Sequence, residues 1–350
     1  MKKVLVINLR YFGDALISSS LSTHIRKSWP DAKITYLVFD RVSSILEGVE
    51  TIDDILTVPE RPKKSDQLAF MLRHFHEFDL ALVTKTGSRP SLYAAFLAKE
   101  RVGFDPGVNR RNWWKRLLLT KHVQAAHASQ VLLFDSLLTA AGCPKTDSFT
   151  VPQPHAELPA GVIPEGPYVV IHPTPRCTYK EWDVDKWQAL IRKLADQGLK
   201  VVLTGSGAEA ELAYVRKAAE GAEGCEIVAG RLSFAQTAEL VARSKAFIGP
   251  DTGTTHVAAS TGVPTVTLFG PTSAAAWGPW APGQSVPYEH KCSEGRQRRG
   301  NVILLQKQPY QQCPCGAKGC LNCDDSHSDC LKAITPDDVI AALRELQVSV

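Results

Sequence analysis

The sequence predicts an α/β protein made of two Rossmann-like domains that face a central cleft. Short, continuously apolar runs, typical of strands buried on both faces of a parallel sheet, alternate with segments of helical periodicity. This alternation occurs twice along the 350 residues, and a proline-rich stretch without periodicity, 151–167, separates the two series. We therefore expect an N-terminal domain over 1–155, a C-terminal domain over 166–335 and a C-terminal helix over 336–350.

The first series begins with the apolar run Val4–Leu9, which is typical of a central strand. The helix expected after it ends before Trp29-Pro30, because proline cannot continue a helix. The last helix of the series ends at Gly142, with Pro144 beyond it. The other expected strands are 34–39, 52–58, 80–84 and 102–104, and the expected helices are 15–28, 42–46, 68–76, 90–98 and 128–140.

The second series follows the proline-rich stretch. Its last helix has a clear start signal, since Thr335 is a good N-cap and Pro336 with two acids occupies the first turn. In open α/β sheets, ligands bind outside the carboxyl ends of the strands, so we expect the site in the loops that follow them. The expected strands are 168–171, 200–204, 226–228, 246–248 and 265–269, and the expected helices are 184–197, 208–220, 234–244, 256–261 and 336–346.

Composition and charge exclude several classes of protein. Apolar residues make up 44% and charged residues 22%, and no apolar run reaches the roughly 18 residues of a membrane span. The N-terminus carries Arg10 where a secretion signal stays apolar, so we expect a cytoplasmic protein. Residues 1–150 hold 21 Lys and Arg against 15 Asp and Glu, a surplus that favours an anionic partner but is too small to indicate nucleic acid.

The stretch 247–259 combines the end of an apolar strand, a Gly-Pro turn and the start of a helix. Backbone N–H groups at such a helix start, together with three threonine hydroxyls, suit a phosphate group. Asp251 would repel that anion, so it either accepts hydrogen bonds from hydroxyl and loop N–H groups or is a simple N-cap. His256 follows one turn later, and we expect it to brace the loop rather than to act as a base.

Two further loops carry candidate catalytic residues. Asp14 follows the first strand and is either an acid favoured by the helix dipole or a general base that faces the cleft. Lys180 lies in a polar loop after the strand 168–171. It is either a solvated lysine or a fixed cation that stabilises a diphosphate leaving group without a metal.

The loop Gly205-Ser206-Gly207 follows a strand and matches the G-x-G-x-x-G/A dinucleotide fingerprint. That fingerprint requires an acid at the end of the next strand, whereas Glu226 stands at the start of it. A nicotinamide dehydrogenase is therefore disfavoured. We expect this loop to approach a nucleotide, with Glu209 or Glu211 near the ribose.

Four segments carry a resemblance when they are taken together and in order. They are Asn-Leu-Arg-Tyr-Phe-Gly-Asp at 8–14, Pro-Thr-Pro-Arg at 173–176 with Lys180 and Trp182, Asp-Thr-Gly-Thr-Thr-His at 251–256, and Leu-Phe-Gly-Pro-Thr at 268–272. Over residues 1–345 the chain resembles the bacterial ADP-heptose:lipopolysaccharide heptosyltransferases, glycosyltransferase family 9, which have the GT-B fold. The first two segments look most similar to the heptosyltransferase III branch.

The resemblance implies an inverting, metal-independent transfer of heptose from ADP-heptose to the inner core of lipopolysaccharide, with no cofactor required. It implies an acceptor bound by the N-terminal domain, with Asp14 as the base, and a donor bound by the C-terminal domain, with Lys180 on the diphosphate. Such a displacement needs both a base and charge stabilisation of the departing ADP. The donor-binding residues that it implies are Thr174, Arg176, Lys180, Glu211, Asp251, Thr252, Gly253, Thr254, Thr255 and His256.

The stretch 109–121 is both basic and aromatic. Such a composition suits the headgroup layer of a membrane and an anionic lipid acceptor, and the alternative is a solvated helix face with two half-buried tryptophans. We expect peripheral contact with the cytoplasmic face of the inner membrane and no nucleic acid partner. The candidate residues are Arg110, Arg111, Trp113, Trp114, Lys115 and Arg116.

Six of the nine cysteines lie within 292–330, and His327 lies among them. In a reducing compartment such a cluster indicates zinc more than disulfides, with free thiols as the alternative. A zinc ion here would be structural and outside the chemistry. The candidate ligands are Cys313, Cys315, Cys320 and Cys323.

Two other functions are compatible with this reading of the sequence. Another nucleotide-sugar enzyme of the same fold, with a different sugar donor or acting as a 2-epimerase, would need acid–base residues around the donor sugar and no basic-aromatic acceptor surface. A non-catalytic, metal-stapled binding protein would lack Asp14 and Lys180, and both are present.

Overall fold

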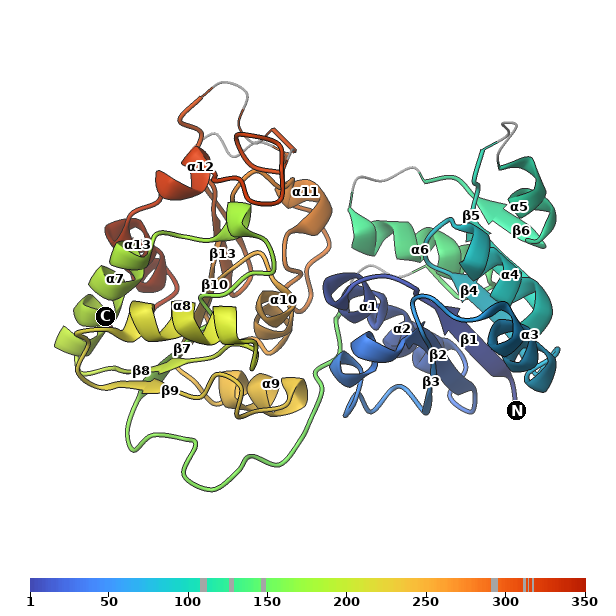
Figure 1. Cartoon of the computed structure of the whole chain (residues 1–350), viewed down its shortest axis with the longest axis horizontal. Coiled ribbons are helices and arrows are strands. Elements are labelled where there is room, and N and C mark those ends of the chain that lie inside the picture. The colour runs from blue at the N-terminus through green and yellow to red at the C-terminus, as the bar shows by residue number, and fades with distance from the viewer. Residues whose placement is uncertain are drawn as a thin grey trace. The chain divides into compact units, whose positions relative to one another are not determined.

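The computed structural model describes residues 1–107, 112–125, 129–145, 149–290, 295–310, 313, 315–316 and 318–350 (Figure 1). The chain divides into two compact units, Met1–Pro152 and Gln153–Val350. The C-terminal helix belongs to the second unit, because Val339 and Leu343 are buried in the core of that unit. No helix among the described residues is both long enough and apolar enough to cross a bilayer.

The first unit contains a six-stranded parallel sheet with the strand order β3-β2-β1-β4-β5-β6. This is the order of the Rossmann fold, in which the direction of winding reverses between the first and fourth strands. The strands are β1 (Lys3–Ile7), β2 (Lys33–Phe39), β3 (Asp54–Val58), β4 (Phe78–Val83), β5 (Ala98–Phe104) and β6 (Lys121–Val123). The helices are α1 (Phe12–Ser18), α2 (Ser20–Ser28), the 3₁₀ helix η1 (Asp40–Ile45), α3 (Lys64–Arg73), α4 (Ser88–Leu97), α5 (Trp113–Leu117) and α6 (Gln130–Ala140).

The single helix expected over 15–28 is two helices, α1 and α2, that meet at Ser19. The hydroxyls of Ser18, Ser19 and Ser20 each donate to the backbone carbonyl three residues earlier, at 2.7, 2.5 and 2.7 Å. Serine hydroxyls that bond back to the chain in this way compete with the regular helical pattern and bend or break it. The break therefore comes from local side-chain chemistry that the apolar periodicity did not reveal.

The second unit repeats the topology of the first. Its seven-stranded sheet has the order β12-β13-β11-β10-β7-β8-β9, and every pair is parallel except the edge pair β12–β13. The strands are β7 (Tyr168–Ile171), β8 (Lys200–Leu203), β9 (Cys225–Ile227), β10 (Ala246–Pro250), β11 (Thr265–Leu268), β12 (Arg296–Arg299) and β13 (Val302–Leu305). The helices are the 3₁₀ helix η2 (Thr178–Lys180), α7 (Val184–Asp196), α8 (Glu209–Ala219), α9 (Phe234–Ala242), α10 (Gly253–Ser260), α11 (Ala274–Trp277), α12 (Asp329–Lys332) and α13 (Pro336–Glu345).

The side chains of β7 alternate between two hydrophobic cores. Val169 and Ile171 pack with residues of α7, α8 and α13 on one face, and Val170 packs with residues of α9 and α10 on the other (Figure 1). Both faces of the sheet are therefore covered, as the continuous apolar runs predicted. The loops at the carboxyl ends of the strands are left to carry polar residues.

Strands β12 and β13 were not predicted. All four residues of β13 are buried, so its apolar run was a usable signal, but β12 reads Arg-Gln-Arg-Arg and has no apolar pattern. A strand at the edge of a sheet tolerates charges, which also protect it from pairing with other chains. β12 can thus be identified only from its pairing with β13 and not from its own sequence pattern.

Candidate active site

Three loops of the second unit meet at one ion pair. Lys180 Nζ lies 2.6 Å from Asp251 Oδ2, and the two side chains are 20% and 8% exposed. Thr272 Oγ1 donates a hydrogen bond of 2.9 Å to the same carboxylate oxygen. We name these residues the Lys180–Asp251–Thr272 cluster. It ties together the loops that follow β7, β10 and β11.

The topology explains why these loops carry the cluster. β7 and β10 are neighbours at the point where the strand order of the second sheet reverses. The chain leaves β7 toward α7 on one face and leaves β10 toward α10 on the other, and the space between such diverging loops is where open α/β sheets bind ligands. The sequence placed Lys180 and Asp251 at this edge, and the structure brings them into contact.

The helix that follows Asp251 begins earlier than predicted. α10 starts at Gly253 instead of His256, and its N-cap is Thr252, which makes no side-chain capping bond. The interpretation of Asp251 as a simple N-cap is therefore wrong, since its carboxylate binds Lys180 and Thr272. The first N–H groups of α10 have no side-chain cap, and uncapped donors at a helix start suit an anion.

His256 is 5% exposed within α10. Burial lowers the pKa of His256 to about 4, an effect that Asp251 opposes and Lys180 reinforces. The imidazole is therefore neutral at physiological pH and a weak base. This state fits a buried residue that braces the loop better than one that takes a proton.

Glu211 braces a second loop at the same edge of the sheet. Its Oε2 accepts hydrogen bonds from Thr174 Oγ1 at 3.2 Å and from the backbone N–H of Ser206 at 2.9 Å.

Gly207 packs directly against Gly230. The φ angle of Gly230 is +74°, and a Cβ added there would lie 2.9 Å from Gly207 Cα. Gly207 of the apparent dinucleotide fingerprint thus serves a close backbone contact.

Asp14 lies in the first turn of α1, directly after β1. Burial raises its pKa above the usual range of an aspartate, while the charges of Arg10 and Lys85 oppose that rise. Asn8 Nδ2 donates to the backbone carbonyl of Asp14 at 3.0 Å and so helps to fix this turn. The result is a half-buried carboxyl group that is a stronger base than an exposed aspartate.

Lys85 is a functional candidate that the sequence analysis missed. It follows β4, which neighbours β1 at the reversal point of the first sheet, and its Nζ donates to Gln130 Oε1. Burial lowers the pKa of Lys85, and the charge of Asp14 opposes that change. The signal that could have found it is its position immediately after a buried strand, the same signal that selected Asp14.

The basic and aromatic stretch forms α5 and the residues around it. None of the five residues of α5 is buried, and Trp113 and Leu117, one turn apart, are 54% and 71% exposed. Lys115 Nζ lies 5.8 Å from the centre of the Trp114 ring, and a guanidinium nitrogen of Arg116 lies 3.6 Å from Asp105 Oδ2.

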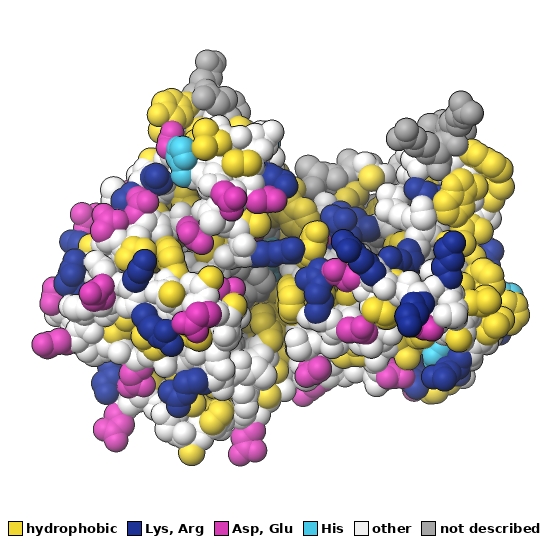
Figure 2. All heavy atoms as spheres, viewed as in Figure 1, with side chains coloured by type: hydrophobic (Ala, Val, Ile, Leu, Met, Phe, Trp, Pro, Cys, Tyr) yellow, Lys and Arg dark blue, Asp and Glu magenta, His cyan; other side chains and the backbone are white. Residues whose placement is uncertain are grey.

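Figure 2 shows hydrophobic side chains gathered beside Lys and Arg on the part of the first unit that carries α5. The other two candidates, Arg110 and Arg111, lie outside the described residues.

In the cysteine-rich segment, the ligand atoms of Cys320, His327 and Asp329 lie within 4.8 Å of one another. Among the described residues, this is the group whose three side chains lie close enough together to bind one metal ion. The described cysteines are free thiols. Three candidate ligands fall outside the group: Cys313, Cys315 and Cys323.

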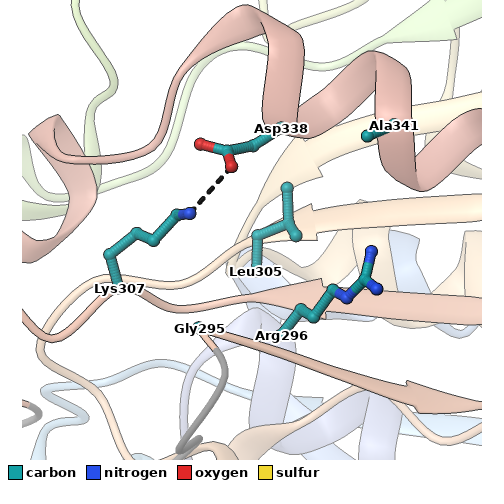
Figure 3. A pocket seen from close by; sticks show the side chains of 6 residues that line it. All are labelled: Gly295, Arg296, Leu305, Lys307, Asp338 and Ala341. Atoms are coloured by element: carbon teal, nitrogen blue, oxygen red, sulfur yellow. Dashed lines mark hydrogen bonds and ion pairs between the residues drawn. The ribbon is translucent and has the colours of Figure 1, made fainter.

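A pocket of the second unit lies elsewhere, beside β12, β13 and α13 (Figure 3). Lys307 and Asp338 point toward each other across it and form an ion pair of 2.7 Å. Although burial raises the pKa of Asp338, hydrogen bonds from Lys307 and Thr335 hold it below its usual value. These polar groups satisfy one another at the start of α13, so we regard the pocket as structural.

Comparison with known proteins shows the family to which this chain belongs. The model of glycosyltransferase family 9 (heptosyltransferase) matches residues 73–302. Lipopolysaccharide heptosyltransferase 3 of Escherichia coli is 27% identical over 357 residues, which cover 97% of each chain.

Two solved structures show the same fold as this chain. One is the glycosyl transferase family 9 protein from Veillonella parvula, with a TM-score of 0.75 at 18% identity over 100% of this chain and 98% of that one. The other is E. coli heptosyltransferase WaaC with ADP, with a TM-score of 0.74 at 18% identity over 98% and 99%. The fold is therefore GT-B, as predicted. The family model matches more than half of the length of this chain. The chain therefore belongs to glycosyltransferase family 9, the heptosyltransferases.

Proposed function

We propose that this chain transfers heptose from ADP-heptose to the inner core of lipopolysaccharide, with inversion at the anomeric carbon and without a metal in the transfer step. The observation that carries the proposal is the Lys180–Asp251–Thr272 cluster, which holds a cation beside the uncapped start of α10 in a member of glycosyltransferase family 9. A cation next to an uncapped helix start suits the binding of a diphosphate.

The second unit would hold the donor. We assign the diphosphate to Lys180 and to the N–H groups and hydroxyls of 252–255, and we assign Arg176, on the same loop as Lys180, to its outer oxygens. Among the described residues, the hydrogen bonds that Glu211 accepts go to Oε2, and we assign its Oε1 to a ribose hydroxyl. Thr174 then acts through Glu211, which it holds in place.

The first unit would hold the acceptor and the base. The Asp14 carboxylate takes the proton of the acceptor hydroxyl as its oxygen attacks the anomeric carbon. The bond from that carbon to ADP breaks, and the electron pair leaves on the diphosphate, whose added charge the Lys180 ammonium stabilises. The charge of Lys85 opposes the rise in the pKa of Asp14 and so favours the ionised carboxylate.

We further propose that the chain meets its acceptor at the cytoplasmic face of the inner membrane. The exposed Trp113 and Leu117 of α5 would enter the headgroup layer, and Lys115 and Arg116 would contact anionic lipid. The 2-epimerase alternative is not favoured, since the curated relatives matched over 97% of the chain are heptosyltransferases.

Asp14→Asn should lower the rate of heptose transfer by about 10²- to 10⁴-fold, the usual contribution of a general base. In the unchanged enzyme, kcat/KM should fall as the pH drops through the raised pKa of Asp14, because only the carboxylate accepts a proton. The assay is mass spectrometry of a core acceptor incubated with ADP-heptose. ADP affinity serves as the control and should stay the same. A variant with the original rate and pH profile would exclude Asp14 as the base.

Lys180→Ala should weaken ADP binding by about 10- to 100-fold, because a charge-assisted hydrogen bond is worth about 1.5–3 kcal/mol. Calorimetric titration without added metal measures this effect. Lys193→Ala is the matched control, since Lys193 pairs with Asp337 on the exposed surface of the same unit. Equal affinities of the two variants, or binding that requires Mg²⁺, would contradict the proposed donor site.

Replacing both Trp113 and Leu117 with Ser should reduce binding to vesicles that contain anionic lipid by about tenfold or more, because two apolar side chains no longer enter the headgroup layer. Co-sedimentation measures the bound fraction. Val286→Ser is the control, since Val286 is 59% exposed on the other unit. If the double variant sediments with vesicles as the unchanged chain does, α5 is not the contact.

A further inference from the structure

The cysteine-rich segment packs against the turn that carries Lys180. Thr178 Oγ1 donates to the backbone carbonyls of Asp324 and Ser326 at 2.7 and 3.2 Å. Ser328, which is 3% exposed, donates through its hydroxyl to the carbonyl of Tyr179 at 2.6 Å. The two residues that precede Lys180 in η2 are therefore held by this segment.

The same segment also contacts the loop of Thr272. The backbone N–H of Gly316 donates to the carbonyl of Pro271, the residue before Thr272, at 2.8 Å. A change in the shape of the segment would thus move two members of the Lys180–Asp251–Thr272 cluster.

Local hydrogen bonds fold the segment 319–329 into a closed loop. The N–H of Cys320 donates to the carbonyl of His327 at 2.8 Å, and the N–H of Asn322 donates to Gly319 at 3.1 Å. The N–H of Leu321 donates to the buried hydroxyl of Ser326 at 2.8 Å. These bonds bring Cys320 next to His327, which lies seven positions further along the chain.

One thiol, one imidazole and one carboxylate converge in this loop. The ligand atoms of Cys320, His327 and Asp329 lie within 4.8 Å of one another, and His327 Nε2 lies 3.3 Å from Asp329 Oδ1. Zn²⁺ binds S, N and O ligands at about 2.0–2.3 Å in a tetrahedron, which requires ligand atoms that are about 3.3–3.8 Å apart. A small closure of the loop would meet this geometry.

We propose that Cys320, His327 and Asp329 bind one Zn²⁺ ion, with water as the fourth ligand, and that the bound ion fixes the segment that positions Lys180. The ion takes no part in the transfer step. It acts through Thr178 and Ser328, whose hydrogen bonds join the loop to η2. The positioning half of the proposal rests on the proposed function, because it takes Lys180 as the contact to the diphosphate.

Titration of the metal-free chain with Co²⁺ tests the ligand set. One equivalent should produce thiolate-to-cobalt absorption, and Zn²⁺ should displace it. Cys320→Ser should abolish the absorption, and Asp329→Asn should weaken Co²⁺ binding by about tenfold or more, since one of three ligands is lost. Cys323→Ser is the control, because the exposed Cys323 lies outside the group, and its spectrum should not change. No absorption in the unchanged chain, or its persistence in Cys320→Ser, would overturn the site.

ADP titration of the zinc-loaded and metal-free chains tests the positioning role. Removal of zinc should weaken ADP binding several-fold, and Ser328→Ala should do the same while the cobalt spectrum stays unchanged. Equal ADP affinity with and without zinc would overturn this role. If neither form binds ADP, the proposed donor site fails, and the cobalt spectrum still decides whether the metal site exists.

Discussion

The ion pair between Lys180 and Asp251 is the contact on which the proposed donor site depends. Its 2.6 Å geometry and low exposure mean that water screens the pair less than it would on the open surface. Asp251 fixes the direction of the ammonium group before any ligand arrives, and Thr272 fixes Asp251. A cation that is already in place loses less conformational entropy when a diphosphate binds.

Both units place their charged residues by the same topological rule. In each sheet the strand order reverses between two central strands, and a charged residue follows each of the two. Asp14 and Lys85 occupy these positions in the first unit, where burial pushes their pKa values toward each other. Lys180 and Asp251 occupy them in the second, where they form a direct ion pair. In the function that we propose, one fold thus supports a base in the first unit and a fixed cation in the second.

The sequence predicted the central strands because continuous apolar runs report burial on both faces. It did not predict that Lys180 contacts Asp251, since the two lie 71 positions apart and only the strand order makes them neighbours. It missed β12 because an edge strand can be charged, and it missed the break at Ser19 because apolar periodicity does not report hydroxyl hydrogen bonds. Cysteine spacing suggested a thiol cluster, and it did not reveal that the folded loop brings His327 and Asp329 to Cys320.

The central claim is that Lys180 binds the donor from a position that Asp251 sets. A double-mutant cycle of Lys180→Ala and Asp251→Asn, read out as the free energy of ADP binding, tests it most directly. The account predicts coupling of at least about 1 kcal/mol, because Asp251→Asn should weaken ADP binding in the presence of Lys180, whereas in Lys180→Ala it removes an unpaired carboxylate that repels the diphosphate. Additive effects of the two substitutions would contradict it, since Lys180 would then act independently of its partner.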